Sequence, residues 1–147
     1  METIPRKNKI LMIGSNPANK APNNEAFHKD VMSRQRLTKL VGDLSRDYDV
    51  GYLNVYPFKT EDNRPPKMSE IHNFIPILKR KIRDFEPDKV VAVGMLAFRV
   101  LTSKIKLQDE GYFVFYLPHP SGLNRFWNDK EKSEEMVQKL KRFLSET

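Results

Sequence analysis

The chain has 147 residues, a length that suits one compact domain over residues 1–147, with residues 1–8 as a flexible basic N-terminus. Its 26 Lys and Arg residues outnumber 19 Asp and Glu residues. The resulting net charge of +7 favours a polyanionic partner, such as nucleic acid, an anionic membrane surface or a phosphorylated substrate. The chain has no cysteine, which excludes disulfides, Cys-ligated metal centres and a thiol nucleophile. Because the three histidines lie in unrelated settings, we predict no metal site and no cofactor.

The sequence lacks the marks of secretion and of membrane insertion. Its first residues are polar and charged, and no stretch approaches the roughly 20 apolar residues of a membrane span. We therefore expect an intracellular protein with no membrane partner, located in the cytoplasm or nucleoid, or in a host cell if the source is viral.

Four short apolar runs predict buried strands, at residues 9–13, 50–55, 89–93 and 112–117. Continuous rather than alternating apolar runs are typical of a parallel sheet that is covered on both faces. Helical patterns lie between and after these runs, at residues 28–45, 68–85, 95–103 and 129–145. Alternation of strand and helix predicts an α/β fold, a three-layer α/β/α arrangement with a central, mainly parallel four-stranded sheet.

Two details refine the second helical pattern. Ser69 is a candidate N-cap residue, and Pro76 within the pattern predicts a kink or a late helix start. The basic residues Lys79, Arg80, Lys81 and Arg83 are expected to form a solvated helix face at the end of the sheet opposite its ligand site, with no role in that site.

Three long connections follow strands, at residues 14–27, 56–67 and 118–128. Open parallel sheets bind their ligands beyond the carboxyl ends of the strands, so these connections are the expected site. The glycine-rich motifs that hold dinucleotides or nucleoside triphosphates are absent from the sequence, which excludes binding of either ligand through such a motif.

Three residues in or just before the first two connections are each open to two interpretations. Asn16 could orient a water molecule or simply belong to an Asn-Pro turn. Phe27 could stack on a base or be the first core residue of the following helix. Asn54, at a strand end, could read the edge of a pyrimidine with its donor and acceptor or cap the strand.

The last connection combines a histidine, an arginine and several apolar residues. His119 lies between two prolines, which hold it rigidly and favour a preorganised donor. Leu123 at a loop tip is suited to wedge into a base stack, and Arg125 can bind a phosphate. The alternative is a hydrophobic loop that folds back on the core, with Trp127 packed against the last helix.

Taken in order, these segments resemble the uracil-DNA glycosylase superfamily over residues 9 to about 145. The first motif is Gly14-Ser15-Asn16-Pro17, and the last is His119-Pro120-Ser121-Gly122-Leu123. The middle of the chain, with Leu53-Asn54-Val55 and Asn63-Arg64-Pro65, is similar to the thermostable iron–sulfur branch, although without cysteine its cluster cannot form.

Two departures from the family pattern bear on specificity. Ala18 stands where the Asn-containing branches usually have Gly and where the uracil-only branch has a bulky Tyr that excludes a 5-methyl group. Gly122 stands where Pro is frequent.

The resemblance implies a monofunctional DNA glycosylase that acts as a monomer on DNA. No Schiff-base lysine can be identified, so we expect no strand cleavage. Such an enzyme flips uracil or a 5-substituted pyrimidine out of the strand and hydrolyses its N-glycosidic bond. The residues it implies fall into three groups: catalytic Asn16 and His119; base-binding Ser15, Pro17, Phe27 and Asn54; and DNA-binding Ser121, Gly122, Leu123, Asn124 and Arg125. Two other functions stay open, a non-catalytic DNA- or protein-binding member of the same fold and an enzyme acting on free modified nucleotides.

Overall fold

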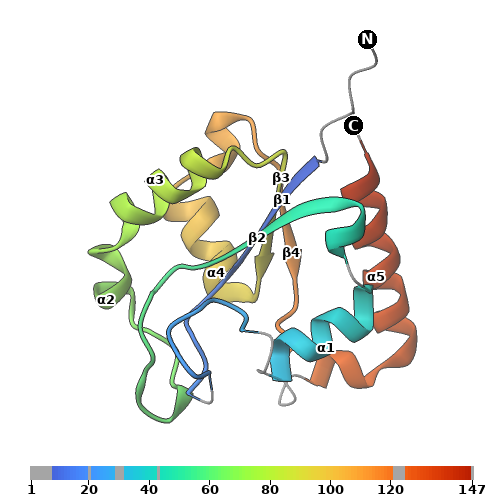
Figure 1. The fold of residues 1–147 in the computed structure, drawn as a ribbon, viewed down its shortest axis with the longest axis horizontal. Helices are drawn as coiled ribbons and strands as arrows, with labels where there is room; N and C mark the ends of the chain where they lie inside the picture. Colours follow the sequence, from blue (N-terminus) through green and yellow to red (C-terminus); the bar gives the residue numbers. More distant parts are fainter. Residues whose placement is uncertain (1–7, 20, 29–31, 43, 121–124, 147) are drawn as a thin grey trace.

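The computed structural model describes residues 8–19, 21–28, 32–42, 44–120 and 125–146. Within them, one sheet of four parallel strands has the order β2-β1-β3-β4 (Figure 1). The strands are β1 Asn8–Gly14, β2 Tyr48–Asn54, β3 Lys89–Val93 and β4 Val114–Leu117. All four lie where the apolar runs predicted them, and the predicted parallel sheet is confirmed.

Helices cover both faces of the sheet, which confirms the three-layer prediction (Figure 1). On one face lie α1 Met32–Val41 and α5 Lys130–Ser145, and on the other lie α2 Met68–His72, α3 Ile75–Phe85 and α4 Met95–Arg99. Short helical turns complete the described chain: η1 Leu44–Arg46, η2 Glu61–Asn63, η3 Val100–Lys104, η4 Leu107–Glu110 and η5 Arg125–Asn128. None of the helices in the described ranges has the length and apolar character needed to cross a bilayer.

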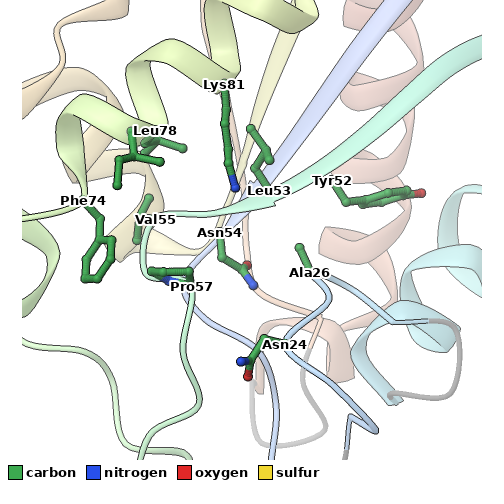
Figure 2. Close-up of a pocket in the computed structure, with 11 residues that line it drawn as sticks. Asn24, Ala26, Tyr52, Leu53, Asn54, Val55, Pro57, Phe74, Leu78 and Lys81 are labelled. Atoms are coloured by element: carbon green, nitrogen blue, oxygen red, sulfur yellow. The ribbon is translucent and has the colours of Figure 1, made fainter.

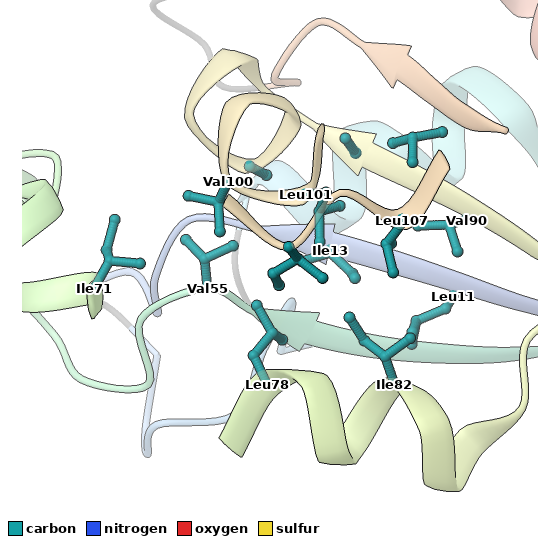
Figure 3. Packing of buried hydrophobic residues seen from close by; sticks show 14 residues of the cluster. Leu11, Ile13, Val55, Ile71, Leu78, Ile82, Val90, Val100, Leu101 and Leu107 are labelled. Atoms are coloured by element: carbon teal, nitrogen blue, oxygen red, sulfur yellow. The ribbon is translucent and has the colours of Figure 1, made fainter. Parts of the chain in front are cut away.

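The central strand β1 divides its side chains between two cores. Leu11 and Ile13 pack with α3 and α4 (Figure 3), whereas Ile10 and Met12 pack with α1 and α5. All four side chains are at most 1% exposed. Side chains of a strand alternate between faces, so burial on both faces requires the unbroken apolar run that the sequence shows.

The helical pattern at residues 68–85 is divided into two helices, α2 and α3. Pro76 occupies the first turn of α3, where its missing N–H leaves no helical hydrogen bond unmade. The predicted interruption by Pro76 is therefore confirmed, as a late start of α3. The predicted N-cap is wrong, because α2 begins at Met68 with Lys67 as its N-cap and places Ser69 inside its first turn.

Connections from two neighbouring strands leave the sheet toward opposite faces. β1 leads toward α1 on one face, and β3 leads directly into α4 on the other. Divergence of this kind opens a crevice at the carboxyl ends of the two strands, which is where open α/β sheets bind ligands. In this chain the two strand ends concerned are at Gly14 and Gly94.

Candidate active site

The connections that follow β1 and β2 run together past the ends of their strands. The Val55 N–H donates to the Gly14 carbonyl and the Tyr56 N–H to the Ser15 carbonyl, each at 2.9 Å. Farther on, Lys59 Nζ donates to the Ala21 carbonyl, and the Asn19 N–H donates to Asn63 Oδ1 at 2.8 Å. These bonds fix the first motif beside the end of β2.

Phe27 and Asn54 both lie against Gly14. A methyl group on Gly14 would come within 2.7 Å of the Phe27 ring and 3.0 Å of Asn54 Oδ1, so only glycine fits there without a shift. Phe27 is 8% exposed and belongs to the core beneath α1, as one of its two interpretations expected. The Phe27 ring therefore both packs in this core and lies against Gly14.

The conformation of Phe27 is held by two neighbours. Its φ of 52° lies in the left-handed region, which is uncommon for a residue with a bulky side chain. Arg34 Nη1 donates to the Phe27 carbonyl at 3.0 Å, and its guanidinium stacks on the Tyr52 ring with 4.1 Å to the ring centroid. The Tyr52 and Phe27 ring centroids are 5.6 Å apart. Arg34 and Tyr52 therefore fix where the ring lies.

Asn16 is oriented by a residue that sequence reasoning missed, Thr60. Asn16 Nδ2 donates to Thr60 Oγ1 at 3.1 Å, and Thr60 Oγ1 donates its proton to the Arg64 carbonyl at 2.5 Å. Because that hydroxyl has one proton, it must accept from the Asn16 amide, which turns the amide nitrogen toward Thr60. Ser15 Oγ donates to Asn16 Oδ1 at 3.1 Å. Thr60 stands in a charged segment of the sequence, and no local pattern marked it.

His119 follows β4 and lies against Gly94, at the end of β3. A methyl group on Gly94 would lie 3.5 Å from His119 Cδ2, and the φ of Gly94 is 98°. The Gly94 N–H donates to the Leu117 carbonyl at 2.8 Å, which keeps the two strand ends together. Burial lowers the pKa of His119 from its ordinary value of 6.5. At neutral pH the ring is therefore neutral and offers one N–H donor.

Trp127 anchors the last connection, residues 118–128, to the core. Its indole Nε1–H donates to the His119 carbonyl at 3.0 Å, and Ser133 Oγ of α5 donates to the Trp127 carbonyl at 3.1 Å. The ring is 7% exposed and packs in the core beneath α5, so the predicted packing against the last helix is confirmed. Arg125 is exposed at the start of η5. The predicted DNA-binding residues Ser121, Gly122, Leu123 and Asn124 lie outside the described residues.

The site residues thus form two groups on neighbouring strand ends. Asn16, Phe27 and Asn54 gather at the end of β1, and His119 lies at the end of β3. Neighbouring strands are about 4.8 Å apart, so the two groups lie at adjacent positions along the edge formed by the strand ends. The two pockets along β2 that are described below have neither Asn16 nor His119 in their walls.

A pocket of about 170 Å³ does adjoin Asn54, on the side that faces α3 (Figure 2). Its walls include Leu53, Phe74 and Lys81. Figure 2 shows the Lys81 side chain extending from α3 toward Leu53 and Asn54. The expectation that this basic helix face lies at the far end of the sheet is wrong for Lys81. The length of the side chain, together with the course of α3 along β2, brings its ammonium to the carboxyl end.

These observations define an α/β protein whose amides and aromatic ring lie at the end of β1 and whose imidazole lies at the end of the neighbouring β3. The model of the Uracil DNA glycosylase superfamily matches residues 1–144. The chain therefore belongs to this superfamily, as its motifs predicted. Members of the superfamily are typically DNA glycosylases, hydrolases that act on DNA and serve its repair. Among curated proteins, no match to the sequence was found.

Proposed function

We propose that this protein is a monofunctional DNA glycosylase that removes uracil or a 5-substituted pyrimidine and acts as a monomer. The observation that supports this most is the placement of His119 and the Asn16–Phe27–Asn54 group on neighbouring strand ends. A planar base turned out of the strand would lie across those ends, between the two groups.

Each group would have a distinct task toward the flipped base. The Phe27 ring would stack on it, and the Asn54 carboxamide, with one acceptor and two donors, would read its Watson–Crick edge. Ser15 and Pro17 would form the wall beside the base. Ala18, where a bulky residue would exclude a 5-methyl group, leaves room for a 5-substituent.

Hydrolysis breaks the C1′–N1 bond, and its electron pair leaves with the base. The neutral His119 ring would donate a hydrogen bond to the pyrimidine oxygen on which that negative charge develops. Asn16, held by Thr60, would position the water whose oxygen bonds to C1′ and whose proton passes to solvent. The sugar cation is strongly electrophilic, so a positioned water suffices without a strong base. Leu123 would fill the gap in the strand, and Arg125 would bind a phosphate.

Base excision tests the proposal directly. Single- and double-stranded oligonucleotides that contain uracil or 5-hydroxymethyluracil are incubated with the protein and then treated with alkali, which breaks the strand at abasic sites. We expect breakage only after alkali. His119→Ala should slow excision by roughly a hundred- to a thousandfold, the usual cost of one oriented donor. His72→Ala, at an exposed position on α2, serves as the control.

Two results would refute the enzymatic proposal: no abasic sites on any of these substrates, or full activity in His119→Ala. The buried Phe27 ring against Gly14 favours one alternative, a DNA-binding protein that releases no base. Salt-dependent binding of DNA, unchanged in Asn16→Ala and without base release, would support that alternative.

A further inference from the structure

Two adjoining pockets line the outer edge of β2, and Tyr52, Leu53 and Lys81 contribute to both. The first, of about 170 Å³, reaches Asn54 and Phe74 (Figure 2). The second, of about 340 Å³, continues along the strand to Phe85 at the end of α3. We call the two together the β2-edge groove. β2 is an edge strand, and the second pocket also reaches Leu11 of the neighbouring β1.

Lys81 supplies the positive charge of this groove. The side chain is exposed and has no ion-pair partner among the residues that the structure describes. The neighbouring carboxylate on the same helix, Asp84, lines the second pocket only. An unpaired ammonium at the wall of a mostly apolar groove is suited to a ligand that joins a planar apolar part to an anion.

Aromatic and aliphatic side chains beside the first pocket provide the apolar part. Phe58 is 48% exposed and Ile77 is 47% exposed. The Phe58 ring meets Tyr56 and Phe74 edge to face, with centroid separations of 5.8 and 5.5 Å. These mutual contacts hold the rings in place, so their exposed surface is preformed. Bases stack on such surfaces with little regard to sequence.

We propose that the β2-edge groove binds the nucleotide next to the excised one, in an unpaired strand. Its base would lie against Phe74 and Ile77, and its phosphate would meet Lys81. The proposal rests on the proposed function, because Asn54 is both the residue that would read the flipped base and a wall of the first pocket. When one base of a DNA strand lies against Asn54, the adjacent nucleotide of that strand can reach the groove. A base held in the groove cannot also be paired, so single strands or unpaired flanks are preferred substrates.

Removal of one charge tests the phosphate contact. Binding of a uracil-containing single strand is measured over a range of salt for the wild type, Lys81→Gln and Arg80→Gln. Arg80 is the matched control, since it is exposed on the same helix and lies outside both pockets. Loss of a phosphate contact should reduce the slope of log affinity against log salt by about 0.7 for Lys81→Gln, with the slope of Arg80→Gln unchanged. Equal slopes for the two variants would overturn the proposal.

A fluorescent base tests the stacking contact. 2-Aminopurine is placed on the 5′ or the 3′ side of the uracil, and its emission should be quenched on one side when the wild type binds. Ile77→Ser, at a half-exposed position that tolerates a polar residue, should relieve the quenching and weaken binding by roughly tenfold. Absence of quenching on both sides, or quenching unchanged in Ile77→Ser, would overturn the proposal.

The same oligonucleotides separate this inference from the proposed function. If abasic sites form but the salt slopes are equal and no quenching is seen, the groove proposal is refuted and the proposed glycosylase function stands. If the slopes differ and quenching is seen but no abasic sites form, the groove stands as a DNA-binding site and the proposed glycosylase function is refuted.

Discussion

Gly14 and Thr60 set the positions of the polar side chains at the site, and neither takes part in the proposed chemistry. Gly14 leaves room for the Phe27 ring and the Asn54 carboxamide above the end of β1. Thr60 orients Asn16 from a connection 44 residues away in sequence. Small changes at these two residues should therefore affect excision through their neighbours.

Gly14→Ala should displace the Phe27 ring, because the new methyl group would lie 2.7 Å from it. Overpacking of this kind costs about 1–3 kcal/mol of stability, and a displaced ring should also slow excision. Single-turnover excision rates and urea unfolding measure the two effects. Leu144→Ala is the control, since it destabilises the core beneath α5 at a buried residue that lines neither the proposed site nor the β2-edge groove. Equal losses of activity in both variants would contradict a specific role for Gly14.

Thr60→Val should release the Asn16 carboxamide, because the variant keeps the shape of the side chain and removes the hydroxyl that accepts from it. A misplaced catalytic group costs up to about a hundredfold in rate, so we expect a loss of roughly ten- to a hundredfold in single-turnover excision. Thr60→Ser, which retains the hydroxyl, should recover most of the rate. Full activity in Thr60→Val would show that Asn16 needs no such support.

At the scale of elements, the strands were predictable because each is buried on both faces and needs a continuous apolar run. The break between α2 and α3 was predictable because Pro76 excludes an unbroken helix. The start of α2 was not, because it depends on Glu70 inside the helix and not on a Ser or Asp side chain at the N-cap: the Lys67 N–H donates to Glu70 Oε1 at 3.0 Å. Arg64 holds the same carboxylate through two bonds of 2.8 and 3.1 Å.

Glu70→Gln should destabilise the protein in a pH-dependent manner. Hydrogen bonding by Arg64, followed by that of the Lys67 N–H, lowers the pKa of Glu70 from 4.5 to about 2. The stabilisation is therefore present above pH 4.5 and is lost as the pH falls toward 2. At pH 7 the urea midpoint of the variant should lie below that of the wild type. The difference should be small, because the Arg64–Glu70 pair is exposed. It should shrink further between pH 5 and pH 3. A constant difference across this range would argue against the ion pair as its cause.

The whole molecule determines the site in a way that local sequence does not. The strand order brings the ends of β1 and β3 together, although Gly14 and Gly94 are far apart in the chain. Motifs predicted Asn16, Asn54 and His119, since each follows an apolar run. They did not predict Thr60, Arg34 or Lys81, because each reaches the site from another element through a long connection or a long side chain.

Burial of His119 couples folding to pH. Its pKa is lowered in the folded protein, so the unfolded chain binds the proton more readily. The contribution to stability is present above pH 6.5 and is lost as the pH falls through the lowered value. In His119→Asn, the plot of unfolding free energy against pH should be flatter below pH 6.5, as urea titrations at several pH values would measure. Parallel plots for the wild type and His119→Asn would contradict the coupling.

The position of β1 also has a consequence for biosynthesis. This strand precedes the other three in the chain, yet it lies between β2 and β3 and cannot gain its second neighbour until residues 89–93 have been made. Until then, the apolar stretch from Ile10 to Ile13 has an open backbone edge and can pair with another nascent chain. The sheet therefore cannot be completed before residues 114–117 of its last strand have been made.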